Sequence, residues 1–170
     1  MIIDFESLGA EPKDFALEVP AEKLELEGER IRLSERVRVK GDARREGDAV
    51  IVQGRIASDA EIGCTRCLEP VSRPFDIEFV SRYVRPDAFG TAGESELIGA
   101  DLEYDSVPAG EIDLVDIVRE QLMLDIPAQA LCREDCRGLC ERCGGNRNTE
   151  ICECDAGDTD PRWSALKNLQ

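Results

Sequence analysis

Histidine is absent from this chain of 170 residues. Its absence removes the imidazole that activates the nucleophile in Ser-His-Asp and Cys-His hydrolases, and it removes imidazole as a general base and metal ligand. The sequence also has no P-loop and no pair of carboxylates at a recognisable catalytic spacing. These absences predict a protein that is not an enzyme.

Long apolar runs are also missing, because the longest falls far below the roughly 18 residues that a membrane span needs. The first residues, Met1-Ile-Ile-Asp-Phe-Glu, lack the basic segment followed by an apolar segment that marks a secretory signal peptide. We therefore expect a cytoplasmic protein that has no contact with membranes.

Basic residues are outnumbered, since 21 Lys and Arg face 37 Asp and Glu and the formal net charge is −16. This charge repels the phosphate backbone of nucleic acids and favours basic partners. Only 5% of the residues are aromatic, which leaves little for stacking on RNA bases. The expected partner is a basic protein or a particle that carries one, and direct RNA binding is the less favoured alternative.

One concentrated basic stretch lies between residues 30 and 45. Apolar and basic residues alternate over 31–40, which predicts an extended segment with its basic side chains on one face. Acidic neighbours such as Glu35 and Glu46 favour a solvated strand face with charge pairs over a stripe that contacts RNA. The candidate RNA contacts in this stretch are Arg36, Arg38, Arg44 and Arg45.

Alternating apolar and polar residues predict a long strand from Val50 to Cys64, because a period of two places successive side chains on opposite faces. The pattern returns from Phe75 to Tyr83 and predicts a second strand. The pair Cys64 and Cys67 is therefore expected at the tip of a β-hairpin. Shorter apolar pieces before residue 47 predict further short strands.

The clearest helix covers residues 113–126. Asp113 is placed to cap it, its apolar residues recur at spacings of three and four, and Pro127 ends it. A second, short helix is expected over residues 160–169, which begin with Asp-Pro, a typical N-cap followed by proline at the first helical position. Both helices are expected to pack on a core.

Eight cysteines are the most informative residues, and six of them lie between residues 132 and 154. This segment is too polar to bury a core, so something other than apolar packing must order it. Cysteines in close pairs in a reducing compartment bind a metal or carry out redox chemistry more often than they form disulfides. Zinc is favoured because a C-x-x-C turn delivers two thiolates to one tetrahedral ion, and an iron–sulfur cluster or redox dithiol is the alternative.

Eight cysteines supply two structural Zn²⁺ sites of four thiolates each, with no open coordination position. The preferred division is Cys64, Cys67, Cys132 and Cys136 for one site, and Cys140, Cys143, Cys152 and Cys154 for the other. It rests on the turn-rich loop 144–151, which is long enough to fold back on itself. The competing division combines the first two cysteines of the chain with Cys140 and Cys143.

Arginines lie beside or between these cysteines, and their simplest role is to offset the negative charge of the thiolates. A sharper alternative is a local patch that binds phosphate or acidic groups. The arginines in question are Arg66, Arg133, Arg137, Arg142 and Arg147. All of them except Arg133 are candidate contacts with a partner or with RNA.

The expected fold class is α+β, with an antiparallel β-sheet or partly closed barrel, one core helix, a cysteine-rich zinc module and a short C-terminal helix. We expect a β-rich core over residues 1–127, and a zinc module with its docking helix over residues 128–170. The two parts are expected to pack as one compact unit.

Five motifs together resemble one protein family. They are C-T-R-C-L-E at 64–69, I-D-L-V-D-I-V-R-E at 112–120, C-R-E-D-C-R-G-L-C-E-R-C-G-G-N-R-N at 132–148, C-E-C at 152–154 and D-P-R-W-S-A-L-K-N-L at 160–169. This combination resembles the bacterial YceD family, also called the large ribosomal RNA subunit accumulation proteins, in its cysteine-rich form. The resemblance spans residue 50 to the C-terminus and departs from many cysteine-rich members at Glu141, where they have proline.

The resemblance implies a cytosolic, non-enzymatic factor that is needed for normal accumulation of large-subunit (23S) ribosomal RNA, through its synthesis, processing or assembly. Genes of the family often lie beside that of a small large-subunit ribosomal protein, which makes such a protein a candidate partner. Resemblance and charge together predict binding to a basic large-subunit ribosomal protein or a pre-ribosomal particle.

Overall fold

The computed structural model describes residues 1–26, 31–86, 103–154 and 162, and the structural statements below concern these residues. The chain divides into two compact units, the first formed by Met1–Ile62 and Ser72–Ala128 and the second by Gly63–Val71 and Gln129–Gln170. The boundary expected from the sequence, after residue 127, assigned Gly63–Val71 to the first part. The contacts of Gly63–Val71 place this segment in the second unit. The expected helix over 160–169 and most of the turn-rich stretch 86–100 lie outside the described residues.

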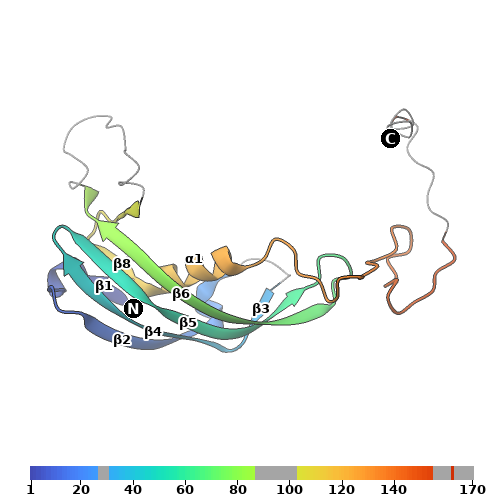
Figure 1. Cartoon of the computed structure of the whole chain (residues 1–170), viewed down its shortest axis with the longest axis horizontal. Helices are drawn as coiled ribbons and strands as arrows, with labels where there is room; N and C mark the ends of the chain where they lie inside the picture. The colour runs from blue at the N-terminus through green and yellow to red at the C-terminus, as the bar shows by residue number, and fades with distance from the viewer. Residues whose placement is uncertain (27–30, 87–102, 155–161, 163–170) are drawn as a thin grey trace. The chain divides into compact units, whose positions relative to one another are not determined.

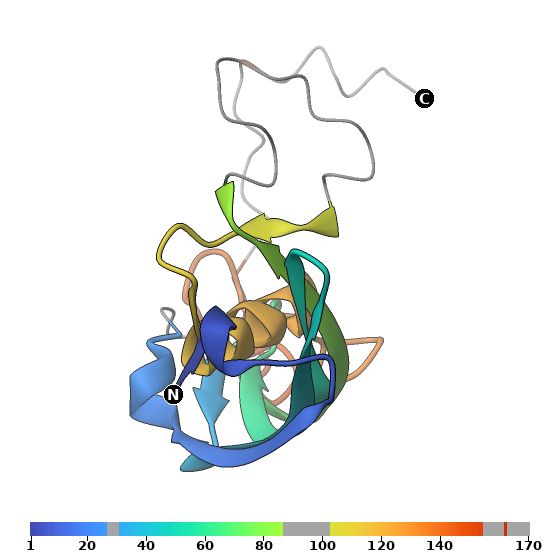
Figure 2. The same cartoon turned by 90° about the vertical axis from the view of Figure 1, so that its left-hand side faces the viewer.

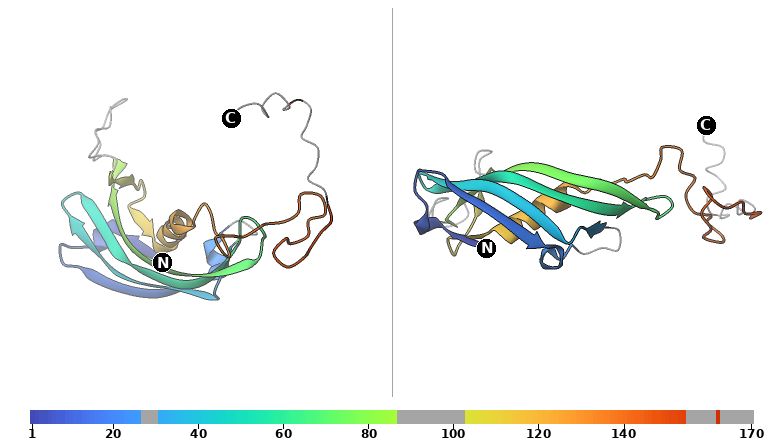
Figure 3. Two further views of the ribbon diagram at one scale, coloured as in Figure 1. Left: turned by 45° about the vertical axis from the view of Figure 1, so that its right-hand side comes forward. Right: turned by 90° about the horizontal axis from the view of Figure 1, so that it is seen from below.

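An open, mixed β-sheet forms the first unit, together with one α-helix (Figures 1 and 3). The strands follow the order β2 (Lys13–Pro20), β4 (Arg36–Glu46), β5 (Ala49–Gly63), β6 (Pro70–Val84) and β7 (Asp105–Ser106), and β3 (Ile31–Leu33) also pairs with β5. A separate two-stranded sheet joins β1 (Ile2–Asp4) to β8 (Glu111–Asp113). The 3-10 helices are η1 (Phe5–Ser7) and η2 (Ala21–Leu24).

The α+β class expected from the sequence is confirmed, and the sheet does not close into a complete barrel. The described part of the sheet ends at β2 on one side and at β7 on the other, and these two strands do not pair. Most neighbouring strands are antiparallel, but β6 and β7 are parallel. A closed barrel would need its edge strands to pair, so the sheet stays open.

Alternation along the strands builds the core of the first unit. On β4, Val37 and Val39 are buried while Arg36 and Arg38 are exposed, as the period of two predicts. On β5 the same alternation buries Val52, Ile56, Ala60 and Ile62. One face of the sheet is therefore apolar, and Figure 2 shows the sheet curving around the helix α1 (Leu114–Asp125).

The helix α1 begins and ends where the sequence predicts. The side chain of Asp113 accepts a hydrogen bond from the N–H of Val115 at 2.9 Å, which satisfies a donor at the helix start. Leu114, Ile117, Val118 and Leu122 are buried, because a spacing of three and four places them on one face. Met123, the apolar residue that follows Leu122, is exposed.

The extended segment expected over residues 31–40 is interrupted. Leu33 pairs with Ala60 and Arg38 pairs with Ala57, so this segment advances from 33 to 38 while β5 advances only from 60 to 57. The two extra residues form a bulge, and the N–H of Ser34 there donates to the carbonyl of Asp59 at 2.7 Å. Two strands, β3 and β4, result instead of one.

A close approach of two glycines lies in the middle of the sheet. Gly41 on β4 pairs with Gly54 on β5. A Cβ atom on Gly41 would lie 2.1 Å from the carbonyl oxygen of Gln53 and 2.8 Å from the ring of Phe15. Only glycine fits at this crossing.

Helices among the described residues are all too short or too polar to cross a membrane.

Candidate metal centres

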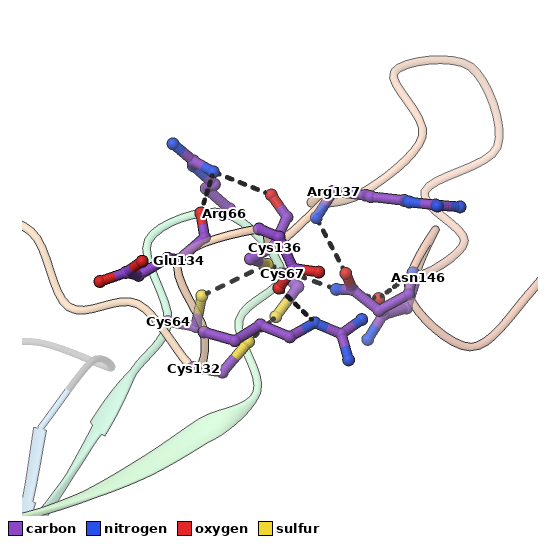
Figure 4. A network of polar contacts seen from close by, with 11 residues as sticks. Cys64, Arg66, Cys67, Cys132, Glu134, Cys136, Arg137 and Asn146 are labelled. Carbon is purple, nitrogen blue, oxygen red and sulfur yellow. Dashed lines mark hydrogen bonds and ion pairs between the residues drawn. The ribbon is translucent and has the colours of Figure 1, made fainter.

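Four cysteines from two distant parts of the chain meet in the second unit (Figure 4). Cys64 and Cys67 lie in the turn between β5 and β6, and Cys132 and Cys136 lie in the segment that follows α1. The Sγ atoms are 3.8 Å apart between Cys64 and Cys136 and 3.6 Å apart between Cys67 and Cys132. Four thiolates at about 2.3 Å from one tetrahedral ion would be separated by about 3.8 Å, so this first cysteine group is sized for a single metal ion.

Burial and backbone hydrogen bonds hold the first cysteine group together. Cys64, Cys67 and Cys136 are buried, and Val71, Leu131 and Leu139 pack against them. The N–H of Thr65 donates to the carbonyl of Ala130 at 2.7 Å, and the N–H of Leu139 donates to the carbonyl of Arg66 at 3.0 Å. Backbone groups of the hairpin turn therefore bond directly to the segment 130–139.

The second cysteine group is formed by Cys140, Cys143, Cys152 and Cys154, whose Sγ atoms all lie within 4.8 Å of one another. These cysteines are half-buried or exposed. They belong to a continuous segment, as the loop length between Cys143 and Cys152 predicts. The structure thus assembles the preferred division of the eight cysteines, and the competing combination of the first two cysteines with Cys140 and Cys143 does not occur.

The two C-x-x-C turns share one backbone geometry. The residue after the second cysteine donates its N–H to the carbonyl of the first, from Leu68 to Cys64 at 2.9 Å and from Gly144 to Cys140 at 2.8 Å. Its φ is positive in both turns, 64° at Leu68 and 72° at Gly144. Glycine adopts this conformation freely, whereas leucine is strained in it.

In the first cysteine group the thiols differ in how readily they ionise. Burial opposes ionisation of Cys64, but backbone N–H groups of Arg66, Cys132 and Cys67 donate to its sulfur and lower that pKa to about 6. Burial and contacts with the neighbouring thiols together raise the pKa of Cys132 to about 12. The hairpin turn therefore favours a thiolate at its first cysteine.

The second cysteine group repeats this arrangement. Backbone N–H groups of Cys143 and Arg142 lower the pKa of Cys140 to about 6. Contacts with the thiols of Cys143 and Cys140, together with burial, raise the pKa of Cys154 to about 12, because a second negative charge close to the first is unfavourable. A divalent cation removes this penalty, since it attracts all four thiolates.

Each group has the donor set of a closed metal site. Four converging sulfur atoms fill the coordination sphere of a tetrahedral ion, so no position is left for a substrate or a catalytic water. The two groups can therefore hold metal ions in a structural role. The N–H groups that point at sulfur fit this role, because they stabilise the negative charge of metal-bound thiolates.

An asparagine network beside the first cysteine group was not expected from the sequence. Asn148 donates from Nδ2 to the Sγ of Cys136 at 3.3 Å. Burial opposes ionisation of Cys136, whereas this hydrogen bond favours it and the pKa of Cys136 is lowered. The available signal was the pair of asparagines that follows the C-x-x-C-G-G motif, Asn146 and Asn148.

The candidate contact arginines of the first unit lie on β4, and three of them have partners. The contacts are Arg36 with Glu18 at 3.2 Å, Arg44 with Glu46 at 2.8 Å, and Arg45 with the carbonyl of Gly47 at 3.0 Å. Arg38 is exposed and forms no ion pair with any residue that the structure describes. These contacts agree with a charge-paired strand face.

The candidate contact arginines of the second unit fall into two classes. Arg66 donates to the carbonyl of Cys136 at 2.9 Å and to that of Glu134 at 3.3 Å, so it stabilises the backbone around the first cysteine group. The other three are exposed, form no ion pair within the described ranges, and line one cavity of about 800 Å³ beside the second cysteine group. They are Arg137, Arg142 and Arg147.

Comparison with known families and proteins gives one family match. The sequence model described as "Large ribosomal RNA subunit accumulation protein YceD" matches residues 52–170. The matched part contains both cysteine groups, most of β5, all of β6 and the helix α1. No solved structure matches the chain.

Several curated proteins are similar to this chain. An uncharacterized protein of Mycobacterium tuberculosis is 28% identical over 130 residues, which are 72% of this chain and 56% of that protein. The "Large ribosomal RNA subunit accumulation protein YCED homolog 1, chloroplastic" of Zea mays is 30% identical over 142 residues, 69% of this chain and 48% of that protein. The uncharacterized protein YlbN of Bacillus subtilis is 29% identical over 137 residues, 78% of this chain and 73% of that protein. The chain thus spans about half the length of its mycobacterial and maize relatives.

Proposed function

Because this chain belongs to the YceD family, we propose that it is a non-enzymatic cytoplasmic factor that supports the accumulation of large-subunit (23S) ribosomal RNA. The observation that carries this proposal is the family match over residues 52–170, which includes both cysteine groups. The name of the maize relative refers to the same process.

Zinc is the metal we propose for both cysteine groups. Thiolate sets of four suit zinc, and the sulfur separations of 3.6 and 3.8 Å agree with a tetrahedral ion. Metal analysis of protein purified without added metal should give close to two zinc ions per chain. Iron with visible absorbance, or a metal content near zero, would contradict this assignment.

A basic large-subunit ribosomal protein, free or within a pre-ribosomal particle, is the partner that we propose. Acidic residues outnumber basic ones by 28 to 14 in the first unit and by 9 to 7 in the second, so 14 of the 16 net negative charges belong to the first. An acidic surface attracts a basic protein over about 8 Å at physiological ionic strength and speeds its association. The first unit is therefore the proposed site of partner binding.

The proposed function is tested in cells from which the gene has been deleted. The ratio of large-subunit to small-subunit ribosomal RNA should fall, and the wild-type chain should restore it. The variant Cys64→Ser/Cys67→Ser should fail to restore it, since the first cysteine group loses two of its ligands. An unchanged ratio in the deleted cells would rule out a role in ribosomal RNA accumulation.

Direct RNA binding is a second candidate, and the cavity lined by Arg137, Arg142 and Arg147 favours it. Guanidinium groups without carboxylate partners can contact phosphates. Two observations oppose direct RNA binding. Glu141 and Glu150 line the same cavity. Each filled metal site, with four thiolates around one Zn²⁺, would also add a formal charge of about −2. The net field of the module is therefore not basic.

Binding measurements at about 0.15 M salt separate the two candidates. Purified basic large-subunit ribosomal proteins should bind, and binding should weaken as salt rises, whereas protein-free 23S ribosomal RNA should not bind tightly. The matched variants are R137A/R142A/R147A and R36A/R38A/R44A, which each remove three positive charges. If bare 23S ribosomal RNA bound tightly and only R137A/R142A/R147A abolished that binding, direct RNA binding would be established in place of binding to a ribosomal protein.

A further inference from the structure

The loop that connects the two halves of the second cysteine group also bonds to the first group. Asn148 lies between Cys143 and Cys152, and its Nδ2 donates to the Sγ of Cys136 at 3.3 Å. In the same loop, Asn146 donates to the carboxylate of Glu69 at 3.2 Å, in the hairpin turn that carries Cys64 and Cys67. The loop of one group thus contacts both chain segments that form the other.

The orientation of the Asn148 amide is determined by its neighbours. The backbone N–H of Arg137 donates to its Oδ1 at 2.8 Å, and an N–H can only donate. Nδ2 must then face the other way, where it meets the sulfur of Cys136 and the Oδ1 of Asn146 at 2.8 Å. Only this orientation of the amide gives each of these contacts a donor and an acceptor, and in it Nδ2 donates to the sulfur of Cys136.

The loop is held by polar contacts, and its two ends carry the cysteines of the second group. Its hydrogen bonds run from the N–H of Cys140 to the carbonyl of Gly145 at 2.8 Å and from the N–H of Arg147 to the carbonyl of Gly138 at 3.0 Å. Ile151, the large apolar residue of this region, is fully exposed. A polar segment without a core needs its metal to offset the entropy of ordering.

We propose that Asn148 couples metal binding at the two cysteine groups. A metal in the second group orders the loop, and the ordered loop presents an N–H to the Cys136 thiolate, which strengthens metal binding in the first group. Hydrogen bonds to metal-bound thiolates act in this way because they stabilise the charge on sulfur. The coupling is reciprocal, so a metal in the first group strengthens binding in the second by the same factor.

This inference rests on the proposed metal binding, and cobalt(II) is the probe that tests it on the full chain. Cobalt affinities are measured by competition with a chelator for the wild type, N148A, C140S/C143S and the combination of all three changes. N148A should still bind two ions, but its first cysteine group should bind cobalt on the order of tenfold more weakly. C140S/C143S should weaken the first group by a similar factor, and adding N148A to it should cause no further loss.

Two further variants separate coupling from a general loss of structure. N148D keeps the acceptor for the N–H of Arg137 but removes the donor to sulfur, so it should weaken the first cysteine group at least as much as N148A. Thr149→Ala removes a hydroxyl whose one hydrogen bond to the described residues goes to the carbonyl of Asn146, and it should leave both affinities unchanged. In N148A the thiolate-to-cobalt absorption of the first group should move to longer wavelength, since its sulfur loses a stabilising donor.

The outcomes are distinguishable. N148A could weaken cobalt binding to the first cysteine group by the same factor in the wild-type and the C140S/C143S backgrounds. That result would overturn the coupling, because Asn148 would then act without the second metal. Unchanged affinities in both N148A and N148D would also overturn it, while leaving the two metal sites intact. A chain that binds no cobalt at all would instead refute the metal binding on which the proposed function draws.

Discussion

At the scale of single residues, Tyr83 carries a pH dependence that the fold creates. Tyr83 is only 7% exposed, and burial raises its pKa to about 12, whereas an unfolded tyrosine titrates near about 10. The folded state therefore holds its proton more tightly. The resulting stability is fully present below about pH 10 and is lost as the pH rises from about 10 towards 12.

Tyr83→Phe tests this effect, because phenylalanine keeps the ring and has no proton to lose. The free energy of unfolding of the wild type should fall more steeply than that of the variant between about pH 10 and 12. Denaturant unfolding at several pH values measures both slopes. Equal slopes would show that the Tyr83 hydroxyl has the same affinity for its proton in the folded and unfolded chains.

The residue that follows each C-x-x-C pair offers a second test at this scale. Gly144 has a φ of 72°, and apart from its chain neighbours no described residue has an atom within 4 Å of the position where its Cβ would be. Gly144→Ala therefore adds backbone strain without a steric clash and should cost about 1 kcal/mol in the metal-loaded protein. Leu68→Gly should change stability in the opposite direction, by less than about 1 kcal/mol, because glycine relieves strain but also frees the unfolded chain.

Thermal unfolding of the metal-loaded proteins measures both substitutions at the C-x-x-C turns. The test is the sign of the change in unfolding temperature. Gly144→Ala should lower the unfolding temperature of the second unit, and Leu68→Gly should not. A gain in stability from Gly144→Ala would contradict the strained geometry assigned to this position.

At the scale of secondary-structure elements, the crossing of β4 and β5 depends on Gly41. A Cβ there would overlap the backbone oxygen of Gln53, which cannot rotate away as a side chain can. Gly41→Ala should destabilise the first unit by about 3 kcal/mol or more, because the two strands would have to separate. Gly9→Ala is the matched control, since nothing lies within 4 Å of its added methyl group. Similar denaturant midpoints for both variants would disprove the close approach.

At the scale of the whole molecule, the two units should respond differently to metal removal. The first unit has an extensive apolar core on its sheet and helix, whereas the described part of the second has a small cluster of Val71, Leu131 and Leu139 around its buried cysteines. Structural zinc contributes on the order of 10 kcal/mol to modules of this kind. A chelator should therefore unfold residues 129–154 and leave the sheet folded.

Hydrogen exchange before and after chelation measures this difference. Amides of residues 129–154 should lose protection, and those of β4, β5 and α1 should keep it. Cys140→Ser should affect the second cysteine group first and leave one metal bound. Loss of protection throughout the sheet on chelation would show that the first unit has no independent stability.

Local patterns in the sequence determined the elements of this protein. The alternation around Val52 and Ile56 determines a strand, and Asp113 with the apolar spacing that follows determines the helix, because these signals act over a few residues. The chemistry of the candidate site was also readable, since C-x-x-C turns bring two thiolates together without help from the rest of the chain.

The tertiary structure alone decided which elements and side chains meet. Cys64 and Cys136 are separated by 72 positions, so only the fold brings their sulfur atoms together. The same holds for the contact of Asn148 with Cys136 and for the crossing of Gly41 with Gly54, which depends on how two strands are paired. Such contacts carry no local signature, because their free energy is gained only when distant segments are already ordered.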